Sequence, residues 1–302
     1  MTISRRMFLT STALVPAIRL AARQAPASQP PPSVTFTPLR RDVGVFTGRG
    51  GTIGWLITPE AVVLVDSQFP DTATLCLEGV KSRSKRQIDL LINTHHHGDH
   101  TAGNIVFKPE TPHILAHENV PALQKKSAEE RGNLDQQAYA DQTFGKTWDQ
   151  DIGHEHLQMG HYGPGHTGGD AVVTFAKANV VHMGDLVFRA RHPFVDRPGG
   201  ASVRNWLTTL EQVVKAHEKD TIYIFGHARD GLGVSGTAAD LTAMRDYFSA
   251  VLDHVQKGIA AGQSRDAIVA LTALPKFEDY PNSPATALAG VLGVAYDELT
   301  QK

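Results

Sequence analysis

The feature that most constrains the fold of this chain is a buried-strand pattern that runs straight into a cluster of histidines. Residues 88–93 read IDLLIN, and residues 94–100 read THHHGDH. In an extended turn alternate side chains point the same way, so His95 and His97 can reach one metal ion. Asp99 and His100, beyond the glycine, face a neighbouring position. A zinc-type ion takes three or four ligands at about 2.0–2.2 Å, so this segment cannot complete two sites and more distant ligands must exist.

Three later segments offer such ligands. Residues 165–170 read GHTGGD, which places His166 in a glycine-rich loop before a strand pattern. Asp185 and His227 each follow a strand pattern, in the sequences VVHMGD and IYIFGH. In layered α/β folds, ligand sites form where the loops that follow strands meet at one edge of a sheet. The sequence therefore predicts that these segments meet the histidine cluster.

Short apolar strand patterns and amphipathic helix patterns follow one another along the rest of the chain. Besides Ile88–Asn93, strands are expected at Val34–Thr37, Val43–Thr47, Thr52–Thr58, Ala61–Asp66, Ala171–Phe175, Asn179–Met183 and Thr221–Phe225. Helices are expected at Asp71–Ser84, Val203–His217, Leu241–Val255, Arg265–Leu274 and Ala285–Leu299.

These motifs together resemble those of the metallo-β-lactamase-fold superfamily of metallohydrolases. The match consists of HxHxDH at 95–100, GHTxGD at 165–170, GD at 184–185 and GH at 226–227, in the order found in the family. The resemblance covers residues 34–240 and implies a four-layer αββα sandwich for that domain. Residues 241–302 are expected to form a C-terminal helical extension packed on it.

The resemblance also implies two adjacent divalent metal ions. Carried over residue by residue, the ligands of the first ion are His95, His97 and His166, and those of the second are Asp99, His100 and His227, with Asp185 bridging both. Zinc is the first choice, with iron and manganese as alternatives because they too accept hard oxygen ligands. Asp99 would also orient the attacking hydroxide or shuttle its proton, which makes it the predicted catalytic residue.

The aspartate at position 185 bears on the substrate. The β-lactamases of this fold usually carry cysteine or serine there, whereas glyoxalase II-like thioesterases, lactonases and related hydrolases carry the bridging aspartate. The resemblance thus favours a hydrolase of a small ester, thioester or lactone that uses a metal-bridging hydroxide. The alternatives are a periplasmic metallo-β-lactamase and a non-catalytic metal-binding or redox-accessory protein.

Three residues are candidates for contacts with this small-molecule substrate. Arg191 and His192 lie in the loop that follows Asp185, where an arginine could hold a carboxylate. Tyr162, shortly before the glycine-rich loop, could donate a hydrogen bond to an oxyanion.

The first 27 residues are expected to be removed. Arg5 and Arg6, a short apolar run and Ala25-Pro26-Ala27 resemble a twin-arginine signal peptide, which predicts export to the periplasm. The apolar run is too short to span a bilayer, so no stable membrane anchor is expected. Residues 28–33 read as a proline-rich linker.

Composition narrows the classes of partner. The chain has 41% hydrophobic and 20% charged residues and a net charge of -2, without the basic excess of a nucleic-acid-binding protein. Its single cysteine, Cys76, excludes an intramolecular disulfide and a multi-cysteine metal site. No pattern in the sequence indicates an oligomeric state.

Overall fold

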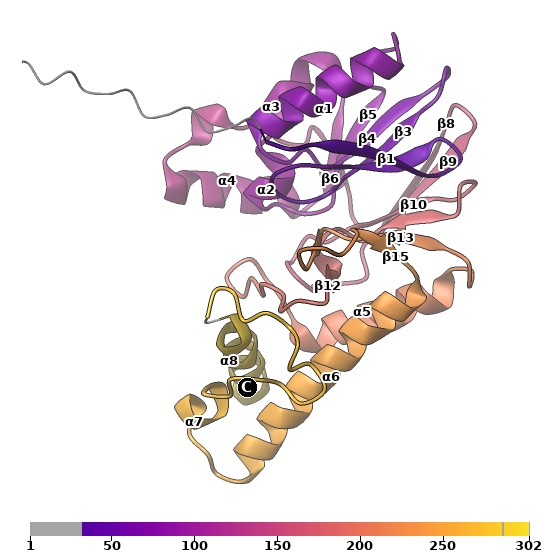
Figure 1. Ribbon diagram of the computed structural model, residues 1–302. Helices are drawn as coiled ribbons and strands as arrows, with labels where there is room; N and C mark the ends of the chain where they lie inside the picture. The colour runs from indigo at the N-terminus through magenta and orange to yellow at the C-terminus, as the bar shows by residue number, and fades with distance from the viewer. Residues whose placement is uncertain (1–31, 286, 302) are drawn as a thin grey trace, which may run out of the picture. The chain divides into compact units, whose positions relative to one another are not determined.

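The computed structural model describes residues 32–285 and 287–301, which form two large β-sheets flanked by helices (Figure 1). The predicted signal peptide, residues 1–27, and most of the predicted linker, residues 28–33, lie outside the described residues. Strand order in the first sheet is β1 (Thr35–Arg40), β2 (Val43–Thr47), β3 (Ile53–Ile57), β4 (Val62–Val65), β5 (Leu90–Asn93), β6 (Ile114–His117) and β7 (Gln142–Phe144). Pairing is antiparallel from β1 to β4 and parallel from β4 to β7.

The second sheet has six strands. Their order is β15 (Ser235–Gly236), β13 (Ile222–Ile224), β11 (Val180–His182), β10 (Val172–Phe175), β9 (Glu155–Gly160) and β8 (Thr147–Ile152). All pairs are antiparallel except β11 with β13. A separate two-stranded ribbon joins β12 (Phe188–Arg189) in parallel to β14 (His227–Ala228).

Helices cover the outer faces of both sheets. They are α1 (Pro70–Arg83), α2 (Gly98–Thr101), α3 (Asn104–Phe107), α4 (Val120–Arg131), α5 (Val203–Ala216), α6 (Ala238–Ala260), α7 (Arg265–Val269) and α8 (Ala287–Thr300). Short 3-10 turns lie at η1 (Lys108–Glu110), η2 (Leu134–Gln136) and η3 (Gly184–Leu186).

The alternation of side chains along each strand produces three apolar layers. In β4, Val62 and Leu64 pack with Cys76 of α1, whereas Val63 and Val65 face the second sheet. The outer face of the second sheet packs against α5, α6 and α8. Figure 1 shows the resulting order of layers, with α1 and α3 on one side and α5 and α6 on the other. This confirms the predicted αββα sandwich.

The C-terminal helices pack on α5. Thr237 and Asp240 form a capping box that starts α6, three residues before the predicted helix. Glu298 of α8 accepts hydrogen bonds from the Ser202 hydroxyl (2.6 Å) and the Val203 amide (2.8 Å), so its charge lies at the N-terminus of α5. The helix predicted at residues 265–274 is shorter in the structure, where α7 ends at Val269 with Ala270 as its C-cap.

Strand ends from both sheets meet at one edge. Asp66 follows β4, Thr94 follows β5, and Asp185 and His227 follow β11 and β13. The Thr94 carbonyl accepts a hydrogen bond from the Ala171 amide at 2.8 Å, which joins the two sheets beside the histidine cluster. Among the described helices, none combines the length and the apolar character that a bilayer span requires.

Candidate metal centre

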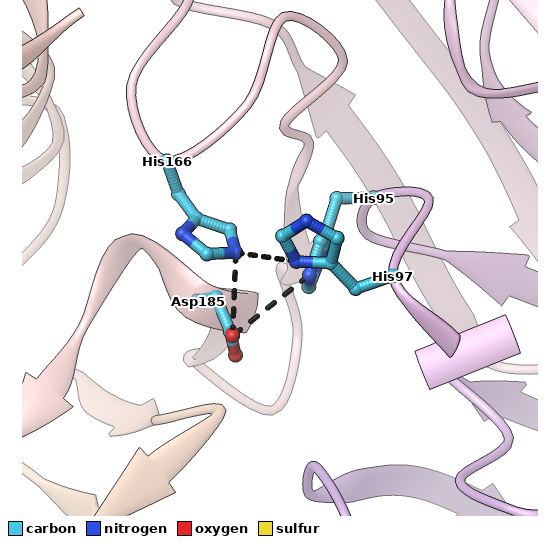
Figure 2. A group of neighbouring side chains, drawn as sticks. All are labelled: His95, His97, His166 and Asp185. Atoms are coloured by element: carbon cyan, nitrogen blue, oxygen red, sulfur yellow. Dashed lines mark hydrogen bonds and ion pairs between the residues drawn. The ribbon is translucent and has the colours of Figure 1, made fainter. Parts of the chain in front are cut away.

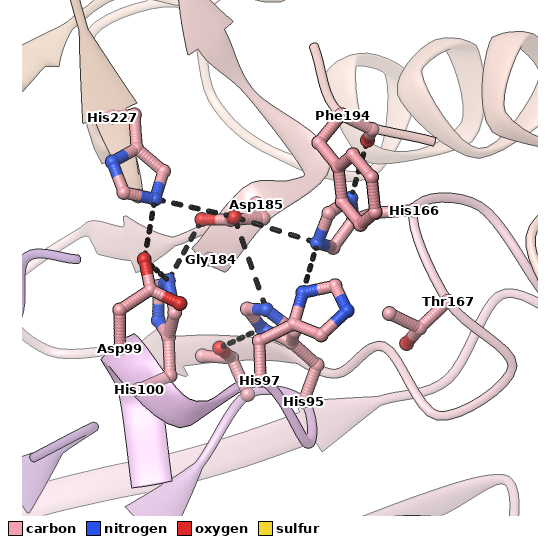
Figure 3. Close-up of polar contacts among 12 residues, drawn as sticks. His95, His97, Asp99, His100, His166, Thr167, Gly184, Asp185, Phe194 and His227 are labelled. Carbon is pink, nitrogen blue, oxygen red and sulfur yellow. Dashed lines mark hydrogen bonds and ion pairs between the residues drawn. The ribbon is translucent and has the colours of Figure 1, made fainter. Parts of the chain in front are cut away.

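The carboxylate of Asp185 lies at the middle of the cluster, within 3.0–3.8 Å of four histidine rings (Figure 3). Its Oδ1 is 3.0 Å from Nε2 of His100. Its Oδ2 is 3.3 Å from Nε2 of His227, 3.4 Å from Nε2 of His166 and 3.8 Å from Nε2 of His95. Asp185 is 4% exposed, so this carboxylate is buried among imidazoles.

All seven residues singled out as metal ligands come together at this point. They form two groups in which the candidate ligand atoms lie within 4.8 Å of one another: His95, His97, His166 and Asp185 in one (Figure 2), and Asp99, His100 and His227 in the other. Asp185 also contacts two histidines of the second group, so its position suits a bridge between two ions.

The GHTGGD loop presents His166 because Asp170 fixes its backbone. The Asp170 carboxylate accepts hydrogen bonds from the amides of Gly165 (3.0 Å) and Thr167 (3.0 Å) and from the Thr167 hydroxyl (2.6 Å). Burial raises the pKa of Asp170 to about 7. This aspartate therefore shapes the loop, and the histidine between its partners points into the centre (Figure 3).

Two histidines of the first group face each other through ring nitrogens. Nε2 of His166 lies 2.9 Å from Nδ1 of His97. The remaining nitrogens donate outward, from His166 to the Phe194 carbonyl (2.8 Å) and from His97 to the Asp196 carboxylate (2.9 Å). Because carbonyls and carboxylates only accept, neutral rings leave two lone pairs aimed at each other. A cation between them would relieve this arrangement.

A single carboxylate orients one histidine of each group. Nδ1 of His100 donates to Oδ2 of Asp66 at 2.7 Å, and the Thr94 hydroxyl donates to the same oxygen at 2.8 Å. Because the Thr94 hydroxyl donates its proton to Asp66, its oxygen can only accept the hydrogen bond that it shares with Nδ1 of His95 at 3.0 Å. Both rings therefore present Nε2 to the centre.

The donor set fits divalent metal ions. Nε2 of His95 is buried and has no hydrogen-bond partner among the described residues, and Nε2 of His100 and Oδ1 of Asp185 are buried against each other at 3.0 Å without hydrogen-bond geometry. Buried polar atoms are rarely left unpaired, because each costs about 1–3 kcal/mol. Imidazole nitrogens and carboxylate oxygens are the ligands that zinc and related ions take in catalytic sites.

The two groups differ in charge. Burial lowers the pKa of His166 to about 3 and that of His95 well below its usual value, so these two rings of the first group are neutral near pH 7. Burial also opposes charge on His227 and His100, but the nearby carboxylates of Asp185 and Asp99 outweigh it. They raise the pKa of His227 to about 9 and that of His100 well above 6.5.

Two glycines let the cluster close. A Cβ on Gly51 would run into the His100 ring, and a Cβ on Gly226 would run into Oδ1 of Asp185 and the Gly184 backbone. The Gly51 amide donates to the Asp99 carbonyl at 3.0 Å, which ties the β2–β3 turn to the centre.

The predicted substrate contacts do not gather around the metal centre. His192 is 5% exposed and its Nδ1 hydrogen-bonds the Tyr247 hydroxyl at 2.8 Å, because the ring packs under α6. Tyr162 lines a cavity of about 700 Å³ beside His117 and His161, and none of the seven candidate ligands borders that cavity. Arg191 is half-buried and has no hydrogen bond or ion pair within the described ranges. These positions give no support to Tyr162 or His192 as substrate contacts.

Four residues of the site were not identified from the sequence. Asp66, Thr94 and Asp196 orient metal-facing histidines, and Phe194 supplies the carbonyl that orients His166. Two of them had an available clue, since Asp66 follows the strand pattern AVVLV and Thr94 follows IDLLIN.

Comparisons with known proteins agree with this geometry. A curated metallo-beta-lactamase type 2 from Bacillus cereus is 27% identical over 195 residues, which cover 63% of this chain and 72% of that protein. A metallo-beta-lactamase structure from Pontibacter korlensis superposes with a TM-score of 0.60 at 19% identity, over 72% of this chain and 99% of that one. The stereoselective inverting sec-alkylsulfatase Pisa1 from Pseudomonas sp. superposes with a TM-score of 0.70 at 13% identity, over 88% of this chain and 50% of that one.

Because the sequence identities are low, the structural matches show a shared fold and nothing beyond it. The family model described as the metallo-beta-lactamase superfamily matches residues 47–227, a span that runs from the end of β2 to the last candidate ligand, His227. By this match, and with its cluster of histidines and aspartates, the chain belongs to the metallo-beta-lactamase superfamily of hydrolases.

Proposed function

We propose that this protein hydrolyses a small ester, thioester or lactone at a centre of two divalent metal ions, with zinc as the first choice. The observation that carries the proposal is the position of Asp185, whose two oxygens reach histidines of both groups. An all-oxygen bridging ligand also accommodates iron or manganese. His95, His97 and His166 would hold one ion, and Asp99, His100 and His227 the other.

Two adjacent divalent ions, when bound, would lower the pKa of a water molecule and polarise an acyl carbonyl. The chain's own residues would orient the reactants. Asp99 is the least buried carboxylate of the centre, with its side chain 28% exposed, and lies 3.1 Å from Nε2 of His227. Despite burial, His100 and His227 lower its pKa to about 2, so it is ionised at neutral pH. It would therefore orient the attacking water by accepting a hydrogen bond.

β-Lactam hydrolysis is the second candidate. The curated relative named above, from Bacillus cereus, is a metallo-beta-lactamase and is 27% identical to this chain. The aspartate at position 185 favours acyl esters over β-lactams, as the family resemblance implies. A non-catalytic metal-binding role is the third candidate.

The test is turnover by the zinc-loaded chain without residues 1–27, measured on nitrocefin, a lactone, a thioester and a nitrophenyl ester. Chelator-sensitive hydrolysis of one of the three acyl compounds, above that of nitrocefin, is the expected result. A rate on nitrocefin far above the others would favour the β-lactamase. If no compound is turned over while two ions are bound, the non-catalytic role would be favoured.

The proposal includes export to the periplasm by the twin-arginine route, supported by Arg5, Arg6 and the Ala25-Pro26-Ala27 pattern. Replacing both arginines with lysine should keep the full-length chain in the cytoplasm of a host that has this pathway. Unchanged export of that variant would contradict the route.

A further inference from the structure

A cavity other than the one beside Tyr162 adjoins the metal centre, on the side of α4. It has a volume of about 260 Å³ and lies between α4 and the loop 194–199. His97 borders it, and the side chain of His97 is 14% exposed, so the cavity reaches the first group of candidate ligands. We call it the α4 pocket and define it by Leu123, Phe194, Pro198, Lys126 and Arg131 together with His97.

Part of the lining of the α4 pocket is apolar. Leu123, Phe194 and Pro198 contribute it. The Phe194 side chain is the most exposed large hydrophobic among the described residues, at 61%. Its ring centroid lies 5.6 Å from that of His97 and 6.2 Å from that of His166. An exposed aromatic ring against catalytic histidines is a surface that an apolar ligand can cover.

The rim of the pocket carries charge without partners. Lys126 and Arg131, five residues apart on α4, have no ion pair or side-chain hydrogen bond within 32–285 and 287–301. Glu130 is the acid on the same rim and is likewise unpaired there. The Asp196 carboxylate is occupied by His97 and the Gly199 amide. Lys126 and Arg131 are thus the two cations of the lining that no carboxylate contacts among the described residues.

We propose that the α4 pocket is a substrate subsite that takes an apolar chain ending in a carboxylate. The chain would lie on Phe194 and Leu123, and its terminal carboxylate would pair with Lys126 and Arg131. The arginine fork suits the two oxygens of one carboxylate, and the lysine ammonium adds a second donor beside it. Preferred substrates would then carry an anionic group a few carbons from the acyl carbonyl. This inference rests on the proposed acyl hydrolysis.

The first test compares two substrates that differ only at the chain end: the p-nitrophenyl ester of valerate and the mono-p-nitrophenyl ester of glutarate. The preference is kcat/KM for the glutarate ester divided by kcat/KM for the valerate ester. The double variant Lys126→Ala/Arg131→Ala should lower this preference about tenfold, through KM, with the valerate ester unaffected. Glu130→Gln should raise it.

Lys125→Ala is the matched control, because Lys125 is an exposed lysine of the same helix that does not border the pocket. It should leave the preference unchanged. An unchanged preference in the double variant, or an equal loss on both esters, would overturn the subsite while leaving acyl hydrolysis standing.

The second test needs no turnover. Calorimetric titration of the zinc-loaded protein with glutarate and with valerate should show tighter binding of glutarate, and the double variant should remove the difference. If no ester is hydrolysed but this binding pattern holds, the subsite stands and the proposed function fails. Equal affinity for the two acids in the unmodified protein would refute the subsite.

Discussion

Nδ1 of His100 donates a hydrogen bond to the Asp66 carboxylate at 2.7 Å, across 34 positions of sequence. Both residues are fully buried. Asp66 also accepts from the amide and hydroxyl of Thr94, and that hydroxyl orients His95. One carboxylate outside the centre thus sets the orientation of a histidine in each group.

Replacing Asp66 with asparagine should weaken metal binding at both positions. The carboxylate accepts three hydrogen bonds through its two oxygens. In asparagine an amide nitrogen replaces one of these oxygens and cannot accept the bonds that this oxygen received. The positive φ of Asp66 (68°) is one that asparagine tolerates, so the backbone should persist. We expect zinc affinity to fall about 10–100-fold, as for other residues that orient metal ligands. A titration against a chromophoric chelator measures this.

Asp149→Asn is the control, because Asp149 is exposed on β8 in the second sheet. It should bind zinc like the unmodified protein. Undiminished affinity in Asp66→Asn would show that the orientation of these rings does not depend on Asp66.

Gly226→Ala should damage the centre by steric conflict alone. The added Cβ would run into Oδ1 of Asp185 and into the rigid backbone of Gly184. We expect a loss of about 1–3 kcal/mol in the free energy of unfolding and fewer bound ions per chain. Chemical denaturation and metal analysis give the two values.

Gly290→Ala provides the comparison for that variant. Gly290 lies on α8, where an added Cβ meets nothing within 4 Å, so alanine should be neutral or stabilise by up to about 1 kcal/mol. If both variants lose the same stability, the close approach at Gly226 is not the cause.

The elements that build the centre were predictable because their apolar patterns are strong. The strand patterns before Thr94, Asp185 and His227 correspond to β5, β11 and β13. The segment between 104 and 160 gave no such signal. In α4 only Val120, Gln124 and Ala128 are buried, and most of β8 faces solvent, so neither shows a clear apolar periodicity.

The residues that orient the candidate ligands were harder to predict than the ligands themselves. Each ligand stands in a short motif that contains a glycine, whereas Asp196 reaches His97 across 99 positions. Phe194 acts through its backbone carbonyl, which any residue could supply. Such roles depend on how the loops are placed in space, and neither residue type nor spacing records that.

His166→Ala should remove most activity and one of the two ions. The ring is fully buried, and its Nε2 lies 2.9 Å from the ligand nitrogen of His97 and 3.4 Å from Asp185. Metal analysis and turnover on the best ester would be measured together, with His156→Ala, a half-buried ring on β9, as the control. Two ions and full rate in His166→Ala would contradict its role as a ligand.

The two metal positions should differ in their dependence on pH. His95 and His166 have lowered pKa values, about 3 for His166, so they bind a metal near neutral pH without losing a proton. His227, with a pKa of about 9, and His100, with a raised pKa, are protonated in the metal-free protein at pH 7. Each must lose its proton to bind a metal. The second ion should therefore release about two protons, and its affinity should rise with pH up to about 9.

The raised pKa of His227 also determines how pH changes the stability of the metal-free fold. The raised pKa of His227 means that its stabilising effect is complete below pH 6.5 and is lost as pH rises through about 9. Raising the pH should thus weaken the metal-free protein while it strengthens binding of the second ion. Zinc titration calorimetry at pH 7, in two buffers of different ionisation enthalpy, counts the protons released by each ion. If both ions released equal numbers of protons, the assignment of neutral rings to His95 and His166 and of charged rings to His100 and His227 would be contradicted.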